Sequence, residues 1–345
     1  MLLSRHYGWF RSRTVATRPK SRGLTLRWSR RAPAWHLARL PEWYIIRPAG
    51  QVPCRRPRLS SNVRPQSSTF RLMSKTASPT ETELLRVING SGFPLQIALQ
   101  NAVEAEAPGW KISHREHAWS NPTDGQSGFI DFVVQNLETS DSIVVECKRV
   151  QDASWLFLGH TGSQKATEVF NTWATVFPEA RAPYFGWVDL RIPLPTPEAQ
   201  FCCVRGQTSN DKNTFLERLA AELVSSTEAL ATEEREYRDN SRESCRLYFN
   251  VIVTTASLYF AEFDKQSLNL HDGTLEKATF HRVPYVRVRK QFSMKARPLT
   301  SKDFHSHRDP DVVRENSVFV VEAPSFTKFL HELQVLKINV RAIGA

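Results

Sequence analysis

Two acidic residues and a lysine stand close together around a turn in this sequence, in segments that are otherwise typical of buried strands. Glu146 and Lys148 lie two residues apart in DSIVVECKRVQD (141–152), and Asp131 lies in GFIDFVVQNL (128–137). Side chains alternate along a strand, so Glu146 and Lys148 share one face. Unpaired buried charges are costly, so these residues need either a partner or a chemical task.

The turn ETSD (138–141) joins the two strands and brings these charges together. With this four-residue turn, Asp131 pairs across the hairpin with Lys148, and Glu146 is a diagonal neighbour of Asp131, about 7–8 Å away. Two carboxylates at this spacing can share one Mg²⁺ ion, with water and phosphate oxygens as its other ligands. Lys148 can stabilise developing negative charge, or orient and deprotonate an attacking water. The alternative is a salt-bridge network of the three groups, which stabilises a fold only weakly.

The elements that position these residues follow from helix caps and hydrophobic periodicity. Thr80 and Glu83 fit a capping box that starts a short helix, and Pro94 opens a second helix with an apolar stripe. Three strands joined by short turns follow, which predicts an antiparallel meander. A helix at about 163–177 and a strand at 184–190 come next, and this helical crossover predicts that the last strand joins in parallel.

The C-terminal half continues with further helices and strands. A long amphipathic helix is expected at 213–236, and a last helix near 325–335. Strands are expected at 247–263, 280–292 and 317–323. We therefore predict an α/β fold, a mixed β-sheet flanked by helices, in a single domain that shows neither an internal repeat nor a clear linker.

The segment GFID (128–131), followed by ECK (146–148), resembles the motif of the PD-(D/E)xK nucleases. This restriction-endonuclease-like superfamily includes Holliday-junction resolvases, and the match in element order covers residues 81–190. The resemblance implies a restriction-endonuclease-like core (αβββαβ) within 81–205, with 206–345 as an elaborated C-terminal half. It also implies a nuclease that requires Mg²⁺ or Mn²⁺, with DNA as its partner in defence, restriction or repair. Related enzymes often dimerise, which makes a homodimer an expectation.

The resemblance assigns roles to the residues of the motif. Asp131 and Glu146 would be metal ligands together with the backbone carbonyl of Cys147, and Lys148 would be the catalytic lysine. Many relatives add a Glu on the first core helix, where this chain has Gln96. An amide brings no charge to the metal site, so a catalytically inactive nuclease-fold protein that binds nucleic acid or acts as a scaffold is the alternative.

Other polar residues are candidates for accessory roles. Glu106 is in phase with the apolar stripe of its helix, Glu116 follows on the first strand, and Gln164 opens the helix after the motif strand. Each of the three also fits an ordinary solvated or satisfied polar position. His114 and His117 have an odd spacing on a strand, so their rings are expected on opposite faces and not in one site.

A basic segment, RVPYVRVRKQFSMKAR (282–297), is a candidate nucleic-acid contact. Arg287 and Arg289 share one strand face with Tyr285, and Lys290 follows directly. Positive charges at this spacing beside an aromatic ring can track phosphates and stack a base. A sheet edge protected by Lys and Arg is the alternative.

The net charge of +11 is unevenly distributed. Residues 1–72 contain fifteen Arg and one Lys against one Glu, which leaves 30 basic and 34 acidic residues in the rest of the chain. Bulk charge therefore does not indicate that 73–345 binds nucleic acid. The Arg- and Ser-rich leader 1–72 has three interpretations: a start assigned too early, with Met73 as the true first residue, a mitochondrial-type targeting segment, or a disordered basic arm.

The remaining composition points to an intracellular protein. The five Cys form no CxxC pair, which favours reduced, structural thiols. No apolar stretch reaches the ~20 residues of a membrane span, and no secretory apolar core follows Met1. We expect a soluble protein without a membrane partner, located in the cytoplasm, or in mitochondria if the leader is a targeting segment.

Overall fold

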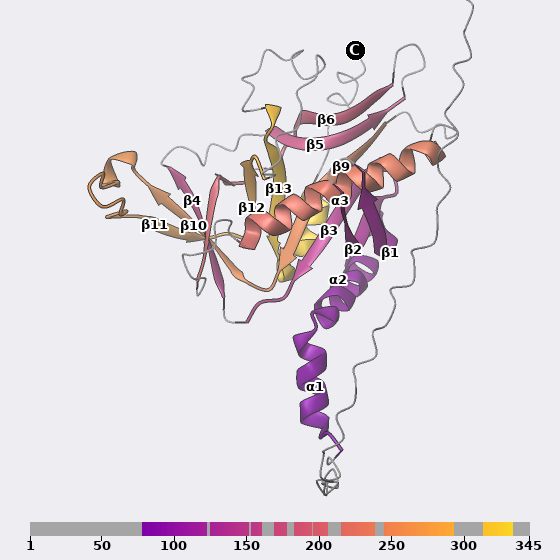
Figure 1. The fold of residues 1–345 in the computed structure, drawn as a ribbon, viewed down its shortest axis with the longest axis horizontal. Coiled ribbons are helices and arrows are strands. Elements are labelled where there is room, and N and C mark those ends of the chain that lie inside the picture. Colours follow the sequence, from indigo (N-terminus) through magenta and orange to yellow (C-terminus); the bar gives the residue numbers. More distant parts are fainter. Residues whose placement is uncertain are drawn as a thin grey trace, which may run out of the picture. The chain divides into compact units, whose positions relative to one another are not determined.

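The computed structural model describes residues 78–122, 125–151, 153–160, 169–177, 183–194, 196–205, 215–238, 245–292 and 313–333 (Figure 1). All of them belong to one unit of the chain, residues 74–345. The expectations for the leader 1–72 therefore lie outside the described residues.

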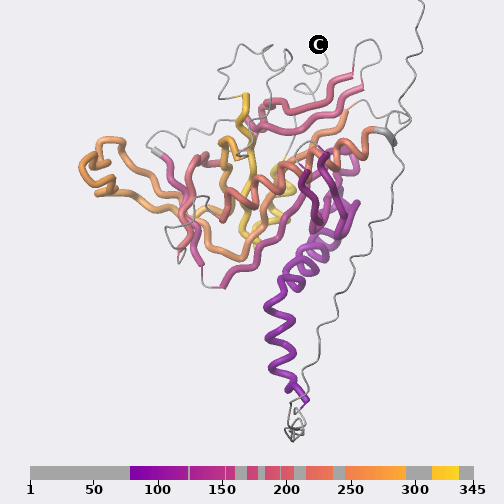
Figure 2. Tube along the Cα trace, viewed as in Figure 1, coloured from indigo at the N-terminus to yellow at the C-terminus, as the bar shows by residue number. Residues whose placement is uncertain are grey.

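Two helices precede the first strand, as the capping residues predict. The helix α1 (Glu81–Gly90) begins after Thr80, which forms both hydrogen bonds of a capping box with Glu83. The helix α2 (Phe93–Glu106) has Pro94 in its first turn, where the missing N–H costs nothing. α1 buries none of its residues, and its trace leads away from the strands (Figure 2).

Three consecutive strands form the predicted antiparallel meander. β1 (Trp110–Asn121) pairs with β2 (Gln126–Asn136), which pairs with β3 (Ser142–Lys148). β3 then pairs in parallel with β9 (Cys245–Thr254), which follows the long helix α3 (Phe215–Arg238). α3 is therefore the helical part of the crossover between two parallel strands. Figure 1 shows α3 lying across β1, β2 and β3.

The segment between β3 and α3 differs from the prediction. Over its described part, residues 169–177, the prediction of a helix at 163–177 is wrong, because Val169–Val176 form the strand β5. The strand β4 (Ser154–His160) precedes it. Four of the eight residues of β5 are β-branched, which favours a strand. β5 pairs antiparallel with β6 (Tyr184–Arg191), so the parallel direction expected for 184–190 is also wrong.

The remaining elements complete two sheets. They are β7 (Glu198–Ala199), β8 (Phe201–Val204), β10 (Ser257–Phe263), η1 (Lys265–Ser267), β11 (Thr279–Arg282), β12 (Tyr285–Lys290), β13 (Asn316–Glu322), η3 (Ala323–Ser325) and α5 (Phe326–Glu332). Within the described residues, the larger sheet has nine strands in the order β1-β2-β3-β9-β13-β12-β7, with β5 attached to β9 and β6 attached to β5. The smaller sheet has the order β11-β10-β4-β8. The strands expected at 247–263 and 280–292 are each divided between the two sheets.

Helices cover both faces of the larger sheet, which confirms the mixed α/β architecture. α3 packs on the face that carries Val133 and Val144, whereas α2 and α5 pack on the opposite face. Asp131 and Glu146 line a cavity with residues of α3, and Lys148 lies over Phe215 of the same helix, so the three charged residues of the motif lie on the α3 side, as the sequence predicts.

Candidate active site

The turn between β2 and β3 decides which residues of the hairpin face each other. The last pair of the ladder joins Gln135 and Ser142, and the N–H of Asn136 donates to the carbonyl of Asp141 at 2.8 Å, so the four-residue turn is 137–140, one residue earlier than expected. Asn136 shapes this turn, because its side-chain oxygen accepts hydrogen bonds from the backbone N–H groups two and three residues further on, both at 2.9 Å. The register therefore differs by two residues from the predicted register.

The corrected register separates Asp131 from its predicted partner Lys148. The ladder ends with the pair Phe132 and Val145, so Asp131 and Glu146 each lie one residue beyond it. There, the Oδ2 atom of Asp131 accepts a hydrogen bond from the N–H of Cys147 at 2.6 Å. The two carboxylates line the same cavity, and the charge of Asp131 contributes to the raised pKa of Glu146, so they form one acidic pair.

A third carboxylate, Glu116, reaches the same row from β1. Its two neighbours in β1 pair with the two neighbours of Asp131 in β2, so Glu116 lies opposite Asp131. Glu116 is exposed and has a left-handed backbone, with a φ of 47°. Its negative charge contributes to the raised pKa of Asp131. Of the accessory candidates, Glu116 is thus the acid that the structure brings to the pair.

Burial and neighbouring negative charges raise the pKa values of Asp131 and Glu146. Burial raises the pKa of Glu146 to about 8, and the charge of Asp131 adds to this shift. Burial likewise raises the pKa of Asp131, although the hydrogen bond from Cys147 favours its charged form. Near pH 7, Glu146 is therefore mostly protonated unless a cation joins the pair.

Lys148 follows Glu146 on the same face of β3 and reaches the start of α3. Its Nζ atom lies 4.7 Å from the centre of the Phe215 ring, a cation–π arrangement. The charge of Lys148 still lowers the pKa values of both Asp131 and Glu146. The lysine is therefore within electrostatic reach of the pair while its ammonium group covers an aromatic ring.

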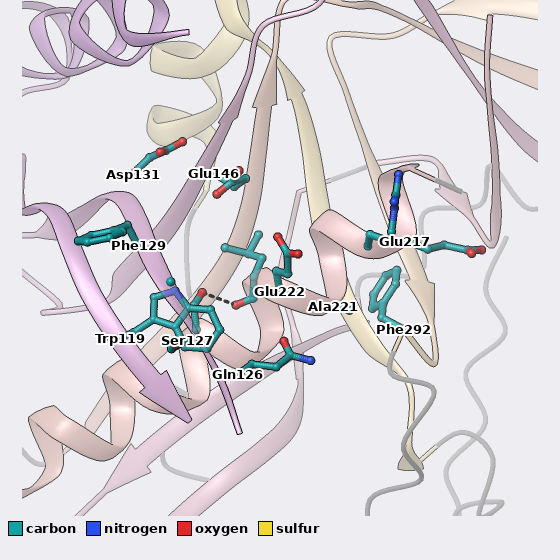
Figure 3. Close-up of a pocket in the computed structure, with 14 residues that line it drawn as sticks. Trp119, Gln126, Ser127, Phe129, Asp131, Glu146, Glu217, Ala221, Glu222 and Phe292 are labelled. Carbon is teal, nitrogen blue, oxygen red and sulfur yellow. Dashed lines mark hydrogen bonds between the residues drawn. The ribbon is translucent and has the colours of Figure 1, made fainter. Parts of the chain in front are cut away.

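The two carboxylates line a cavity of about 590 Å³ between the meander and α3. From α3 the lining includes Glu217, Arg218 and Glu222, and Figure 3 shows the carboxyl group of Glu222 directed into the cavity. The charge of Glu222 adds to the raised pKa of Glu146. The sequence places this helix in the C-terminal elaboration, and only the pairing of β3 with β9 reveals its place in the site.

Trp119 and Phe129 form an aromatic part of the cavity wall (Figure 3). Trp119 pairs with Gly128 across β1 and β2, and its Nε1 lies 3.3 Å from the position that a Cβ atom of Gly128 would occupy. A larger residue would push the indole away, so the glycine permits this close approach. Phe129, the next residue, is 70% exposed.

Gln96 supports the backbone of the site. Its side chain is buried, and its Nε2 atom donates a hydrogen bond to the backbone oxygen of Asp131 at 2.7 Å. An ionised carboxylate could not donate this bond. Gln96 therefore holds β2 against α2 at Asp131, the first acidic residue of the motif.

The other two accessory candidates do not join the described site. Glu106 is exposed at the end of α2, and its side chain accepts a hydrogen bond from Thr327 of α5 at 3.2 Å. This corrects the expectation that Glu106 could complete the metal site. Gln164 lies outside the described residues.

The basic residues of β12 are engaged in ion pairs, which corrects their assignment to nucleic-acid binding. Arg287 is 1% exposed and pairs with Glu198 at 2.8 Å. Arg289 pairs with Asp189 at 3.0 Å and with the acid that precedes β13. Lys290 pairs with a glutamate of α3. β12 lies between β13 and β7, so the alternative of a protected sheet edge is wrong as well.

His114 and His117 lie side by side, contrary to the expectation of opposite faces. Their ring centroids are 4.7 Å apart in an edge-to-face contact. The register of β1 shifts between Ile112 and His114, and the left-handed Glu116 follows. Such irregularities change the alternation of side chains along a strand. His117 also contacts Glu233 of α3 at 2.9 Å, which joins β1 to the helix.

The donor groups fit a hard divalent cation in part. Mg²⁺ binds one or two carboxylates together with water and substrate oxygens, and Asp131 and Glu146 can supply the two carboxylates. Their raised pKa values are those of a pair that a cation would stabilise. However, across the part of the chain that the structure describes, no group of three or more His, Cys, Asp or Glu side chains could hold a metal ion. The Cys147 carbonyl as a further ligand stays a prediction.

Comparison with known proteins does not assign a function to this chain. In the described segments, no helix is long and apolar enough to cross a lipid bilayer. The chain matches no family model, no curated protein and no solved structure.

Proposed function

We propose that this protein is a nuclease that hydrolyses phosphodiester bonds of nucleic acid, with DNA as its substrate and Mg²⁺ or Mn²⁺ as its cofactor. The observation that carries the proposal is that Asp131 and Glu146 line one cavity, with Lys148 close enough to lower the pKa values of both. This combination supplies two acidic ligands and one cationic group at a single position.

The order of the elements supports the same proposal. α2, the meander β1–β2–β3, the crossover helix α3 and the parallel strand β9 follow one another as αβββαβ, the order of the restriction-endonuclease-like core. In this assignment the strands β4 to β8 are an insertion before the crossover helix. The core then extends from α2 to β9, instead of ending near residue 205.

Each residue of the site has a defined task in this reaction. The bound metal would neutralise negative charge on the phosphate and polarise its oxygens. Asp131 and Glu146 would hold it, and the hydrogen bonds from Cys147 and Gln96 keep Asp131 in place. Lys148 would turn from the ring that it covers to orient the attacking water or to stabilise the charge that develops at phosphorus. The reaction class is in-line attack of water at phosphorus.

A nuclease fold that has lost turnover is the second candidate. Lys148 lies over Phe215, and Gln96 donates to the backbone, so two positions that serve the chemistry in the resembling family have other contacts here. Such a protein would bind nucleic acid or act as a scaffold without cutting it. A homodimer stays a prediction for both candidates.

Cleavage of DNA by the full chain tests the proposal. We expect plasmid and oligonucleotide substrates to be cut with Mg²⁺ and protected by a chelator. Lys148→Ala should lower the rate about 100-fold or more, because a positioned proton-transfer group contributes at least this factor. Lys328→Ala, which removes an exposed lysine of α5, is the matched control and should keep the full rate.

The outcomes separate the two candidates. Undiminished cutting by Lys148→Ala would exclude the role assigned to this lysine. A wild-type protein that binds DNA but never cuts it, at any divalent metal concentration, would favour the second candidate.

A further inference from the structure

The cavity beside the carboxylates has the size of a small-ligand pocket. Its volume of about 590 Å³ lies within the ~300–1,000 Å³ that such pockets span. Residues of β1, β2 and β3 form one wall, and α3 residues such as Ala221 and Leu223 form another. Asp131 and Glu146 therefore face α3 across a confined space (Figure 3). On a flat surface, the same residues would be accessible to a broad duplex.

The walls of this cavity favour an unpaired nucleotide over a duplex. Enzymes that work inside a pocket act on a single strand or on a nucleotide that has left the base stack, because a stacked duplex cannot enter. The two arginines of β12 that could have formed a track for duplex phosphates are buried in ion pairs. Arg218 lies exposed in the lining of the cavity, within reach of a phosphate that enters it.

Phe129 offers the surface on which a base could stack. Its ring is 70% exposed, although it is a large apolar group in the lining of the cavity. Phe129 precedes Asp131 by two residues, so both side chains lie on one strand face about 6.6 Å apart along β2. Trp119 packs on the preceding Gly128 and supports this part of the strand. A stacked base would cover apolar surface that otherwise stays in water.

We propose that this cavity binds an unpaired nucleotide of single-stranded nucleic acid, with its base stacked on Phe129 and its phosphate next to Asp131 and Glu146. This inference rests on the proposed nuclease function and adds the class of substrate. The substrate is a single strand, a strand end or an unpaired nucleotide at a junction, and an intact duplex enters only where a nucleotide can leave the stack.

Binding of a short single strand tests this inference. The probe is a fluorescently labelled thymidine tetranucleotide in Mg²⁺, because its few phosphates limit the attraction of the basic residues 1–72. All variants carry Lys148→Ala, so that the probe is not cut. We expect Phe129→Ala to weaken binding about 5- to 100-fold, as the loss of one stacked base does.

Matched variants separate stacking from a general loss of structure. Phe129→Trp retains an aromatic face and should bind within about threefold of its parent. Phe280→Ala removes a ring that is 57% exposed on β11 in the other sheet, and it should leave the affinity unchanged. A hairpin duplex added at the same phosphate concentration should compete at least about tenfold less well than an unlabelled single strand.

The result distinguishes this inference from the proposed function. Equal affinity of Phe129→Ala and its parent, or equal competition by the duplex, would overturn the inference. A wild-type enzyme that cuts duplex as fast as single strand would overturn it while leaving the nuclease proposal intact. Binding of the single strand through Phe129 without any cleavage would support the proposed nucleotide pocket and contradict the proposed nuclease function.

Discussion

At the residue scale, Glu146 occupies a position that is costly for a carboxyl group. Its pKa is raised to about 8 by burial and by the charges of Asp131 and Glu222. Two carboxyl groups that face each other destabilise a fold when both are ionised, and apolar residues would cost less. A divalent cation removes this repulsion, and its binding would release the proton of Glu146. The arrangement is therefore explained by a ligand more readily than by stability.

Gln96 gives a residue-scale prediction. Gln96→Leu removes the donor to the Asp131 carbonyl and should lower the free energy of unfolding by about 1–3 kcal/mol, measured by urea denaturation. Gln96→Glu can donate the same bond only when it is protonated. Its stability should therefore approach that of the wild type near pH 5 and fall below it at pH 8. Equal stability of Gln96→Glu and wild type at both pH values would contradict this role.

At the element scale, the sequence was sufficient to place the charges on one face but not to pair them. Alternation along β2 and β3 fixes the face, because a register error of two residues exchanges the partners and keeps the side. Asn136 closes the turn one residue earlier than expected, and its two side-chain hydrogen bonds cannot be read from the pattern of apolar residues. The register that brings Asp131 and Glu146 together therefore had to come from the structure.

Asp141, which ends this turn, gives a pH prediction. It is 6% exposed and accepts hydrogen bonds from Thr139 and Leu247, yet burial raises its pKa to about 6. The folded state then binds more protons than the unfolded state, so the stability due to Asp141 falls as the pH rises from about 4 to 6. Asp141→Asn should remove this part of the pH dependence in urea unfolding. Parallel stability curves of variant and wild type over this range would contradict it.

The insertion between β3 and α3 limits prediction at this scale as well. The sequence identifies α3 and β9 as a helix and a strand in nearly correct positions. It cannot show that they continue the meander, because β4 to β8 lie between them in the chain. Nothing in the sequence therefore placed this helix, and with it Glu222, beside the cavity.

At the scale of the whole molecule, residues far apart in sequence decide what the basic strand β12 does. Alternating arginines are equally typical of a surface that binds phosphates and of a strand whose charges are paired internally. Glu198 and Asp189 come from distant segments and neutralise Arg287 and Arg289. Only the assembled sheet distinguishes the two cases, so this part of the candidate site could not be predicted.

The buried pair gives a prediction at this scale. Arg287→Ala breaks the ion pair of a fully buried arginine with Glu198, and should lower the free energy of unfolding by about 3–5 kcal/mol. Chemical denaturation measures this loss, and Arg115→Ala is the control because its ion pair with Glu104 is exposed on both sides, at 54% and 53%. A loss below about 1 kcal/mol in Arg287→Ala would indicate that this arginine is not buried in an ion pair.

A crystal structure of the full chain grown with Mn²⁺ tests the central claim most directly, because the anomalous signal of the ion locates it independently of any activity. The account predicts a peak between the carboxyl groups of Asp131 and Glu146, with oxygen ligands at about 2.0–2.6 Å, the range of hard divalent cations. Loss of the peak in Asp131→Asn would strengthen the assignment. Carboxyl groups that point apart, or an ion bound elsewhere with none at this pair, would contradict it.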